Sequence, residues 1–345
     1  MIELFEMLIL AVAQGIGEFL PISSSGHNAV LVHLFDRFGA PLAEDSSEFV
    51  KLNVLLHVGS LVAVLIIFRQ RIFDMFSKDT RLILLLAIAT IPAVVVGVLV
   101  KKLAPWLEDS LPLISVCFIA TGLLLFYSRR LEHLASVKKA EPKHRVSPHP
   151  LQFSSYRKGY SGFADGAKGH LDSVSHVPPP QRQEEGKTTA AMTWIDALII
   201  GCSQALAVMP GLSRSGTTIV TGLICKLRRE EAAAFSFLMS IPIIAGGGLW
   251  ELIHMIRHPA EPSTSAIPDW LLLAGALASC AAGIVALIFL LNWLKKGKLW
   301  YFAIWVFVMS PLTMLLYLTA PAELDLAQEP AAAVQIEEYG ENKNE

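Results

Sequence analysis

Two stretches of equal length decide the fold: QGIGEFLPISSSG at residues 14–26 and QALAVMPGLSRSG at residues 204–216. Each follows a short hydrophobic run, and each contains a proline followed by Ser and Gly. Proline and glycine interrupt a helix, whereas Ser favours the start of the helix that resumes. Residues 4–35 and 194–225 are therefore each predicted to form a helix, a polar turn and a shorter helix.

The composition of the chain indicates a membrane protein. Of its 345 residues, 53% are hydrophobic and 17% are charged, and the mean hydropathy is +0.52. Soluble domains carry roughly 25% charged residues. Six uncharged runs approach or exceed the ~20 apolar residues that cross a hydrocarbon core: residues 52–68, 82–100, 111–128, 232–250, 270–294 and 299–322. We expect six spanning helices, and nothing in the charge pattern indicates nucleic-acid binding.

The two helix–turn–helix segments are too short and too polar to be spans of their own. A polar turn in lipid leaves backbone groups without partners, so it must be buried in protein or line a wet cavity. We interpret both segments as re-entrant hairpins. Each is followed by three predicted spans, so the chain reads as two repeats in an all-α polytopic membrane protein.

The distribution of Lys and Arg predicts that the repeats are inverted. The connections at residues 69–81, 129–193, 226–231 and 295–298 hold 4, 11, 3 and 3 of these residues, whereas those at 36–51, 101–110 and 251–269 hold 2, 2 and 1. Positive charge favours the cytoplasmic side. Both termini are then outside, and the hairpins enter from opposite faces and meet near the midplane.

Four segments make up the predicted chain organisation. Residues 1–128 form the first repeat and residues 193–322 the second, inverted one. Between them, residues 129–192 are rich in Pro, Gly, Ser and basic residues, which is typical of a flexible cytoplasmic linker. Residues 323–345 form an acidic tail that we also expect to be flexible.

The two turns together have the groups of an anion site. Helices resume after both turns, so two helix N-termini point into one cavity, and Arg214 adds a permanent positive charge. A phosphate group suits such a site. The residues expected to line it are Gln14, Ser23, Ser25, Gly26, Ser213, Ser215, Gly216 and Thr217. The two glycines are expected to allow close approach of the backbone.

The first turn also carries groups for catalysis. A hydroxyl among Ser23, Ser24 and Ser25, the imidazole of His27 and the carboxylate of Glu18 supply a nucleophile, a proton-transfer group and an orienting charge. Phosphoryl transfer needs these parts. Serines before a helix are also ordinary caps. His57, in a predicted span, is interpreted as a helix-contact residue, and Asp196 as an interfacial one.

QGIGEFLPISSSGH and MPGLSRSGTT resemble the two signature loops of the bacterial undecaprenyl-diphosphate phosphatases, also called bacitracin-resistance proteins. LHVGSLVAVLIIFRQRI, IPAVVVGVL and FSFLMSIPIIAGG are similar as well. The resemblance covers the membrane portion of the chain. It implies a bacterial inner-membrane enzyme that hydrolyses undecaprenyl diphosphate, a polyprenyl diphosphate lipid, and recycles the carrier for cell-wall synthesis. Its site would open to the outer face.

The resemblance also implies roles for single residues. It makes Ser24 the expected nucleophile, forming a phosphoserine, with His27 transferring protons and Arg214 stabilising the transferring phosphoryl group. Attack by His27 or by a water stays open. A divalent cation, Mg²⁺ or Ca²⁺, is implied as cofactor, and no organic cofactor. Many members have Glu at the position of Gln14; because Gln binds a metal less firmly, Glu18 is the expected ligand.

A polyprenyl-phosphate transporter is the rival function. Inverted repeats with broken helices and polar midplane loops are typical of secondary transporters, and a flippase would use the same anion site. Translocation needs Arg214 and the helix termini but not a nucleophile. The sequence leaves open the prenyl chain length, any role in transport and whether the chain forms a homodimer; membrane lipids are its expected surroundings.

Overall fold

The computed structural model describes residues 2–39, 46–107, 109–140, 186–257 and 267–320. They are helical apart from turns and one isolated bridge between Lys187 and Leu227, and the described part contains no strand. Most of the predicted linker and the acidic tail lie outside the described residues. The described residues up to 132 and from 186 onward form one compact unit.

The six predicted spans are confirmed as helices that are long and apolar enough to cross a membrane. They are α3 (Ser46–Ile67), α5 (Thr80–Leu103), α6 (Leu111–Ala140), α9 (Arg229–Arg257), α10 (Asp269–Leu294) and α11 (Tyr301–Leu318). Helix α6 continues into the stretch predicted as linker. Pro92, Pro242 and Pro311 lie inside α5, α9 and α11, which membrane helices tolerate because neighbours satisfy the freed backbone groups.

Five further helices complete the described part of the chain, with the 3₁₀ turns η1 (Pro105–Leu107) and η2 (Thr189–Ala191). Helices α1 (Ile2–Phe19) and α2 (Ser24–Arg37) form one hairpin, and α7 (Trp194–Leu206) and α8 (Arg214–Ile224) form the other. Helix α4 (Arg69–Ser77) joins α3 to α5 and leaves Phe73 and Phe76 exposed. Helix α7 begins with a capping box between Thr193 and Asp196.

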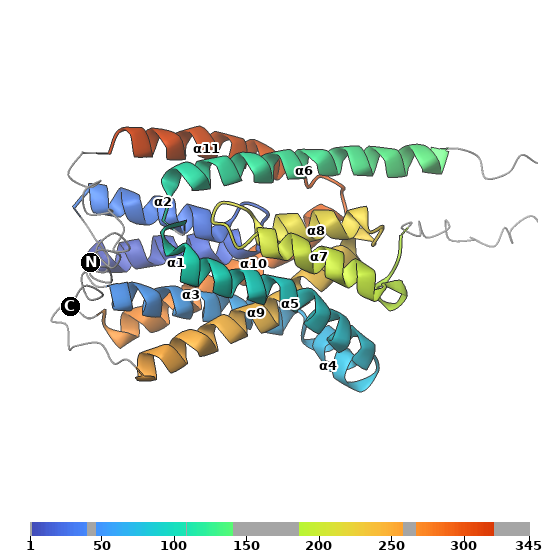
Figure 1. The fold of residues 1–345 in the computed structure, drawn as a ribbon, viewed down its shortest axis with the longest axis horizontal. Helices are drawn as coiled ribbons and strands as arrows, with labels where there is room; N and C mark the ends of the chain where they lie inside the picture. The colour runs from blue at the N-terminus through green and yellow to red at the C-terminus, as the bar shows by residue number, and fades with distance from the viewer. Residues whose placement is uncertain (1, 40–45, 108, 141–185, 258–266, 321–345) are drawn as a thin grey trace, which may run out of the picture. The chain divides into compact units, whose positions relative to one another are not determined.

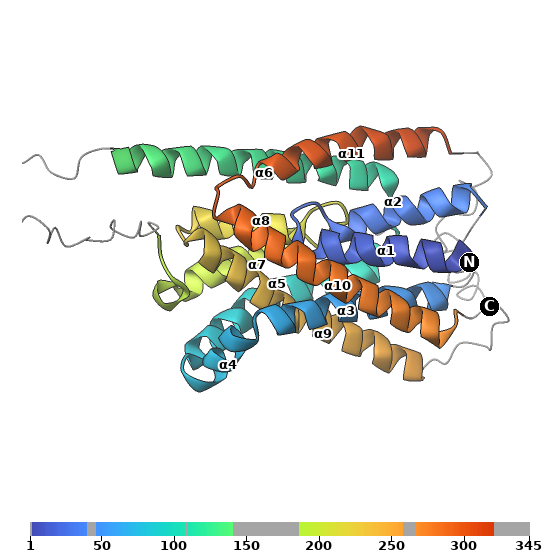
Figure 2. The same cartoon turned by 180° about the vertical axis from the view of Figure 1, so that it is seen from behind.

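The hairpins enter the compact unit from opposite ends (Figure 1). Helix α1 starts at the end where α9 finishes, whereas α7 starts at the end where α9 begins. Each hairpin packs its first helix against a span of the other repeat: α1 against α10 and α7 against α5. Seen from behind, α10 lies across α1 and α3 (Figure 2). The opposite directions of the two hairpins and their packing against each other's repeat agree with an inverted repeat. The insertion of the hairpins in a membrane stays a prediction.

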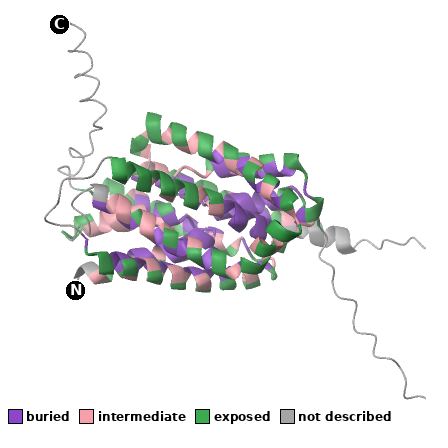
Figure 3. Ribbon diagram, turned by 90° about the horizontal axis from the view of Figure 1, so that it is seen from below, coloured by how far each residue is buried: buried purple, intermediate pink, exposed green. Residues whose placement is uncertain are grey.

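Small residues allow these helices to approach closely, as is common between membrane helices. A Cβ on Gly15 of α1 would lie 2.3 Å from the carbonyl oxygen of Ser279 in α10, and one on Gly201 of α7 would lie 2.3 Å from that of Ala89 in α5. Buried residues gather in the middle of the helices and exposed ones on the outer faces (Figure 3).

The end of α1 is anchored in the main hydrophobic core. Phe19 is fully buried and contacts Phe237 of α9 edge-on, with ring centroids 5.7 Å apart. Because Phe19 directly follows Glu18, this contact fixes the position of the last turn of α1, and with it the carboxylate that organises the site.

Candidate active site

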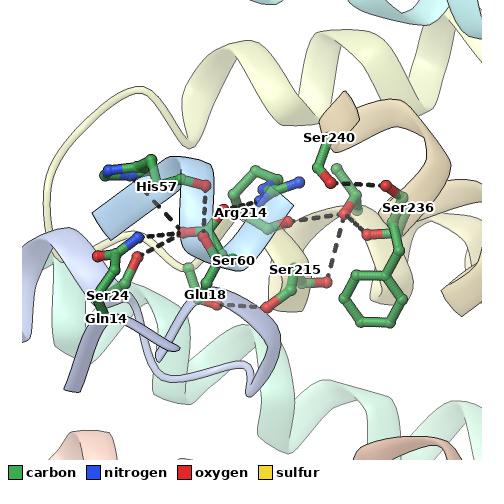
Figure 4. A network of polar contacts seen from close by, with 12 residues as sticks. Gln14, Glu18, Ser24, His57, Ser60, Arg214, Ser215, Ser236 and Ser240 are labelled. Carbon is green, nitrogen blue, oxygen red and sulfur yellow. Dashed lines mark hydrogen bonds and ion pairs between the residues drawn. The ribbon is translucent and has the colours of Figure 1, made fainter. Parts of the chain in front are cut away.

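Glu18 is the centre of a buried polar network (Figure 4). Its Oε2 accepts hydrogen bonds from the Ser24 hydroxyl at 2.9 Å and from Gln14 Nε2 at 3.1 Å. Its Oε1 accepts from Arg214 Nη2, which forms an ion pair with it. Glu18 and Arg214 come from different hairpins, so the predicted meeting of the two turns is confirmed at side-chain level.

Both hairpins present a helix N-terminus to this network. Ser23 caps α2 by accepting the Gly26 amide at 3.3 Å, and Ser213 caps α8 by accepting the Gly216 amide at 3.1 Å. The first helical residues are therefore Ser24 and Arg214, the two positions that face each other when the repeats are aligned. N-terminal N–H groups and the helix dipole favour an anion here.

The backbone of the two turns approaches more closely than side chains would allow. A Cβ on Gly26 would lie 2.9 Å from Cα of Gly211 and 2.8 Å from the Phe118 ring. One on Gly216 would lie 3.1 Å from Cβ of Pro21. The predicted structural role of Gly26 and Gly216 is thus confirmed.

Ser23 has φ of 71°, a left-handed conformation that is strained for a residue with a side chain. Such strain persists only where the surroundings enforce it, and it gathers at functional sites. Here it directs Ser24 toward Glu18.

The remaining predicted lining residues hold the turns together. Ser25 lies 3.3 Å from Ser23, hydroxyl to hydroxyl, and Ser215 donates to the carbonyl of Leu20 at 3.2 Å, which bridges the two hairpins. Thr217 donates to the carbonyl of Ser213 at 2.7 Å within its own helix. These hydroxyls orient the backbone, while Ser24 alone among the predicted serines donates to Glu18 in the described network.

Thr121 of α6 supports the second turn from outside the hairpins. Its hydroxyl donates to the carbonyl of Gly211 and accepts the amide of Ser213, both at 3.0 Å. This contact could not be predicted from the sequence, because a threonine in an apolar span is an ordinary residue.

His27 is placed away from the carboxylate. Its Nδ1 donates to the carbonyl of Ser23 at 2.8 Å, and its Nε2 accepts the indole N–H of Trp305 at 2.8 Å. The ring also packs edge-on against Phe118 at 5.2 Å between centroids. Both nitrogens therefore have partners outside the Glu18 network, and in this arrangement His27 supports the strained Ser23 backbone.

Two residues join the network that sequence reasoning did not place there. His57 of α3 lies with Nε2 3.9 Å from Glu18 Oε2, and Asn28 of α2 donates from Nδ2 to Gln14 Oε1 at 2.9 Å. The sequence analysis interprets His57 as a helix-contact residue. The feature that could have pointed to the site is a titratable side chain in an otherwise apolar span. For Asn28, the corresponding feature is a polar amide directly after His27, at the start of a mostly apolar stretch.

Some buried polar atoms in and near the site have no partner within the described residues. They are Arg214 Nη1, Asn28 Oδ1 and both amide atoms of Gln204. A buried donor without a partner is costly, so the unpaired nitrogen of Arg214 indicates a site built for an anionic ligand. The charge on Arg214 suits a phosphate oxygen at this position.

Glu18 does not present a ready cation site in this arrangement. Both its oxygens already accept hydrogen bonds, one from a guanidinium, and a cation would have to displace one of these donors. The described residues contain no group of three or more His, Cys, Asp or Glu suited to a metal ion. Binding of a divalent cation at Glu18 therefore stays a prediction.

A cavity of about 460 Å³ lies elsewhere, at the junction of α3, α4 and α5. Arg71 and Thr189 are among its lining residues, and both bind Glu231. None of the predicted site residues lines this cavity, so we assign it no part in the chemistry.

The family model described as bacitracin resistance protein BacA matches residues 7–154 and 167–312. An undecaprenyl-diphosphatase of Rhodopirellula baltica is 34% identical over 316 residues, covering 92% of this chain and 99% of the relative. Similar proteins with the same name come from Alkaliphilus metalliredigens, 30% identical with 90% and 98% covered, and Carboxydothermus hydrogenoformans, 32% identical with 89% and 94% covered. The two turns, with Ser24 and Arg214, lie inside the matched residues, and the chain belongs to the bacitracin resistance protein BacA family.

Proposed function

We propose that this chain is an integral-membrane phosphatase that hydrolyses undecaprenyl diphosphate to undecaprenyl phosphate and inorganic phosphate. The protein recycles the cell-wall lipid carrier and confers resistance to bacitracin. It works in the bacterial inner membrane with both termini outside. The observation that supports this proposal most strongly is the hydrogen bond from the Ser24 hydroxyl to buried Glu18 at 2.9 Å. Arg214 forms an ion pair with the same carboxylate.

The first step follows from these contacts. Ser24 Oγ attacks the terminal phosphorus and gives its proton to Glu18 Oε2, which already accepts that hydrogen bond. The bond from phosphorus to the bridging oxygen breaks, and its electron pair leaves with undecaprenyl phosphate. Phosphoserine remains.

Arg214 and the two helix N-termini stabilise the charge on the transferring group. The unpaired Nη1 of Arg214 and the N–H groups at the starts of α2 and α8 donate to its equatorial oxygens. His27 serves this site indirectly by holding the Ser23 backbone, and its predicted proton transfer would require release from Trp305.

Phosphate release by purified protein tests this function. The parent in detergent should release phosphate from a polyprenyl diphosphate, and Ser24→Ala should lower kcat by more than about 10³-fold, as loss of a nucleophile does. Ser77→Ala is the control: its exposed hydroxyl only donates to the carbonyl of Phe73 at 2.8 Å in α4, so it should match the parent. Full turnover by Ser24→Ala would contradict the assignment. Absence of turnover by the parent, with lipid movement across vesicles, would favour the transporter.

A further inference from the structure

His57 reaches the Glu18 carboxylate from a separate helix. It lies on α3, and its Nε2 is 3.9 Å from Glu18 Oε2, the oxygen that also accepts the Ser24 hydroxyl. Its side chain is 31% exposed, so the ring is not enclosed by the protein. Figure 4 shows the imidazole directed at Glu18.

The protonation pattern of His57 follows from its other contact. Nδ1 lies 2.8 Å from the carbonyl oxygen of Asn53, and a carbonyl oxygen can only accept, so Nδ1 carries the hydrogen. In the neutral ring, Nε2 then has its lone pair toward Glu18. His57 Nε2 and Glu18 Oε2 are then two acceptors 3.9 Å apart. A water molecule can bridge them by donating a hydrogen bond to each.

His27 lacks such a free nitrogen. Its Nδ1 donates to Ser23 and its Nε2 accepts from Trp305, so it would have to break a hydrogen bond before taking a proton. Of the two histidines close to the turns, His57 is the one with an acceptor atom facing Glu18.

We propose that His57 is the general base of the second half-reaction, the hydrolysis of phosphoserine; this rests on the proposed function. A water gives a proton to His57 Nε2 as its oxygen bonds to phosphorus. The Ser24 Oγ–phosphorus bond breaks, and its electron pair stays on Oγ, which takes back the proton held by Glu18. Inorganic phosphate leaves, and His57 passes its proton to solvent.

Trapping the intermediate tests this role. His57→Ala and His57→Gln should form phosphoserine as fast as the parent in a single turnover with polyprenyl diphosphate labelled at the terminal phosphate. They should hydrolyse it about 10²-fold more slowly, the lower end of the range for general-base catalysis. Labelled Ser24 should therefore accumulate in acid-quenched samples. Both kcat and KM should fall, while kcat/KM stays close to that of the parent, because only the second half-reaction is slowed. Added imidazole should speed hydrolysis in His57→Ala.

The matched control is His33→Ala, because His33 makes the same bond from Nδ1 to the carbonyl four residues earlier, Ala29, at 2.9 Å on α2. It should turn over like the parent without accumulating label. Parent-like kcat in both His57 variants, or no trapped phosphoserine in them, overturns the inference. The proposed function fails separately, when the parent itself releases no phosphate.

Discussion

At the scale of single residues, the Glu18–Arg214 pair explains how two charges are tolerated inside the helices. A buried ion is expensive unless it is paired and hydrogen-bonded, and removing one partner leaves the other uncompensated. Glu18 accepts hydrogen bonds from three side chains, and Arg214 Nη1 has no partner among the residues that the structure describes. The pair therefore stabilises the meeting of the hairpins while retaining a donor for the ligand.

Substitutions of Arg214 should separate these two roles. Arg214→Ala leaves Glu18 buried and unpaired, which should lower the free energy of unfolding by about 3–5 kcal/mol. Arg214→Lys keeps the charge but lacks a second planar donor, so stability should be closer to the parent while kcat/KM falls about 10²-fold. Thermal unfolding in detergent and phosphate release on the same preparations measure both. Full activity of the Lys variant would show that Nη1 has no role.

Gln14→Glu tests the relation of the site to divalent cations. Gln14 Nε2 donates to Glu18 at 3.1 Å, so the substitution places a second carboxylate beside the first. Like charges this close destabilise the fold, and a Mg²⁺ or Ca²⁺ ion between two carboxylates relieves the repulsion. The Tm of Gln14→Glu should rise more on adding Mg²⁺ or Ca²⁺ than that of the parent or Gln14→Ala. Equal shifts in all three would speak against cation binding at this position.

At the scale of elements, the second helix of each hairpin begins at a residue to which we assign a part in the proposed reaction, Ser24 in α2 and Arg214 in α8. Ser23 and Ser213 cap these helices, and the turns pack through Gly26 and Gly211. Gly211 has φ of 86° and would place a Cβ 2.6 Å from the carbonyl oxygen of Ile114. The turns therefore have little freedom to accept a side chain at either glycine.

Gly26→Ala should push the hairpins apart. Its Cβ would clash with Gly211 and Phe118, at a cost of about 1–3 kcal/mol, as is typical of overpacking. We expect a lower Tm and a larger proportional loss of kcat, because Ser24 would shift relative to Arg214. Gly246→Ala on α9 is the control, since a Cβ there has no neighbour within 4 Å. A variant Gly26→Ala with parental Tm and kcat would contradict the close packing of the turns.

The sequence predicted the hairpins well because a repeated pattern of Gln, Pro, Ser and Gly carries the turn chemistry. It did not predict that the second helix of the first hairpin begins at Ser24, because the positive φ of Ser23 depends on tertiary contacts that helix propensity does not report. The approach of His57 to Glu18 was missed for a similar reason. It depends on the rotation of α3 against α1, and an apolar span with little periodicity does not fix which face turns inward.

At the scale of the whole unit, the two repeats have the same architecture but different chemistry. The first contributes Glu18, Ser24 and His57, and the second contributes Arg214. Helix α1 packs against α10, and α7 packs against α5, so each hairpin is held by a span of the other repeat. A single copy of the repeat would contain either Ser24 or Arg214 but not both. The candidate site therefore forms only when both repeats are folded together.

Orientation in the membrane is the prediction that belongs to this scale. The connections at residues 69–81, 226–231 and 295–298, with 4, 3 and 3 Lys and Arg, lie at one end of the helices, opposite the connection between α5 and α6 with 2 (Figure 1). Positive charge favours the cytoplasm. In a chain with Cys117, Cys202, Cys225 and Cys280 replaced, Asp109→Cys between α5 and α6 should react with an impermeable maleimide on intact spheroplasts. Lys296→Cys between α10 and α11 should react only after permeabilisation. The reverse pattern would place both termini in the cytoplasm and make the first hairpin, with Ser24, enter from the cytoplasmic face.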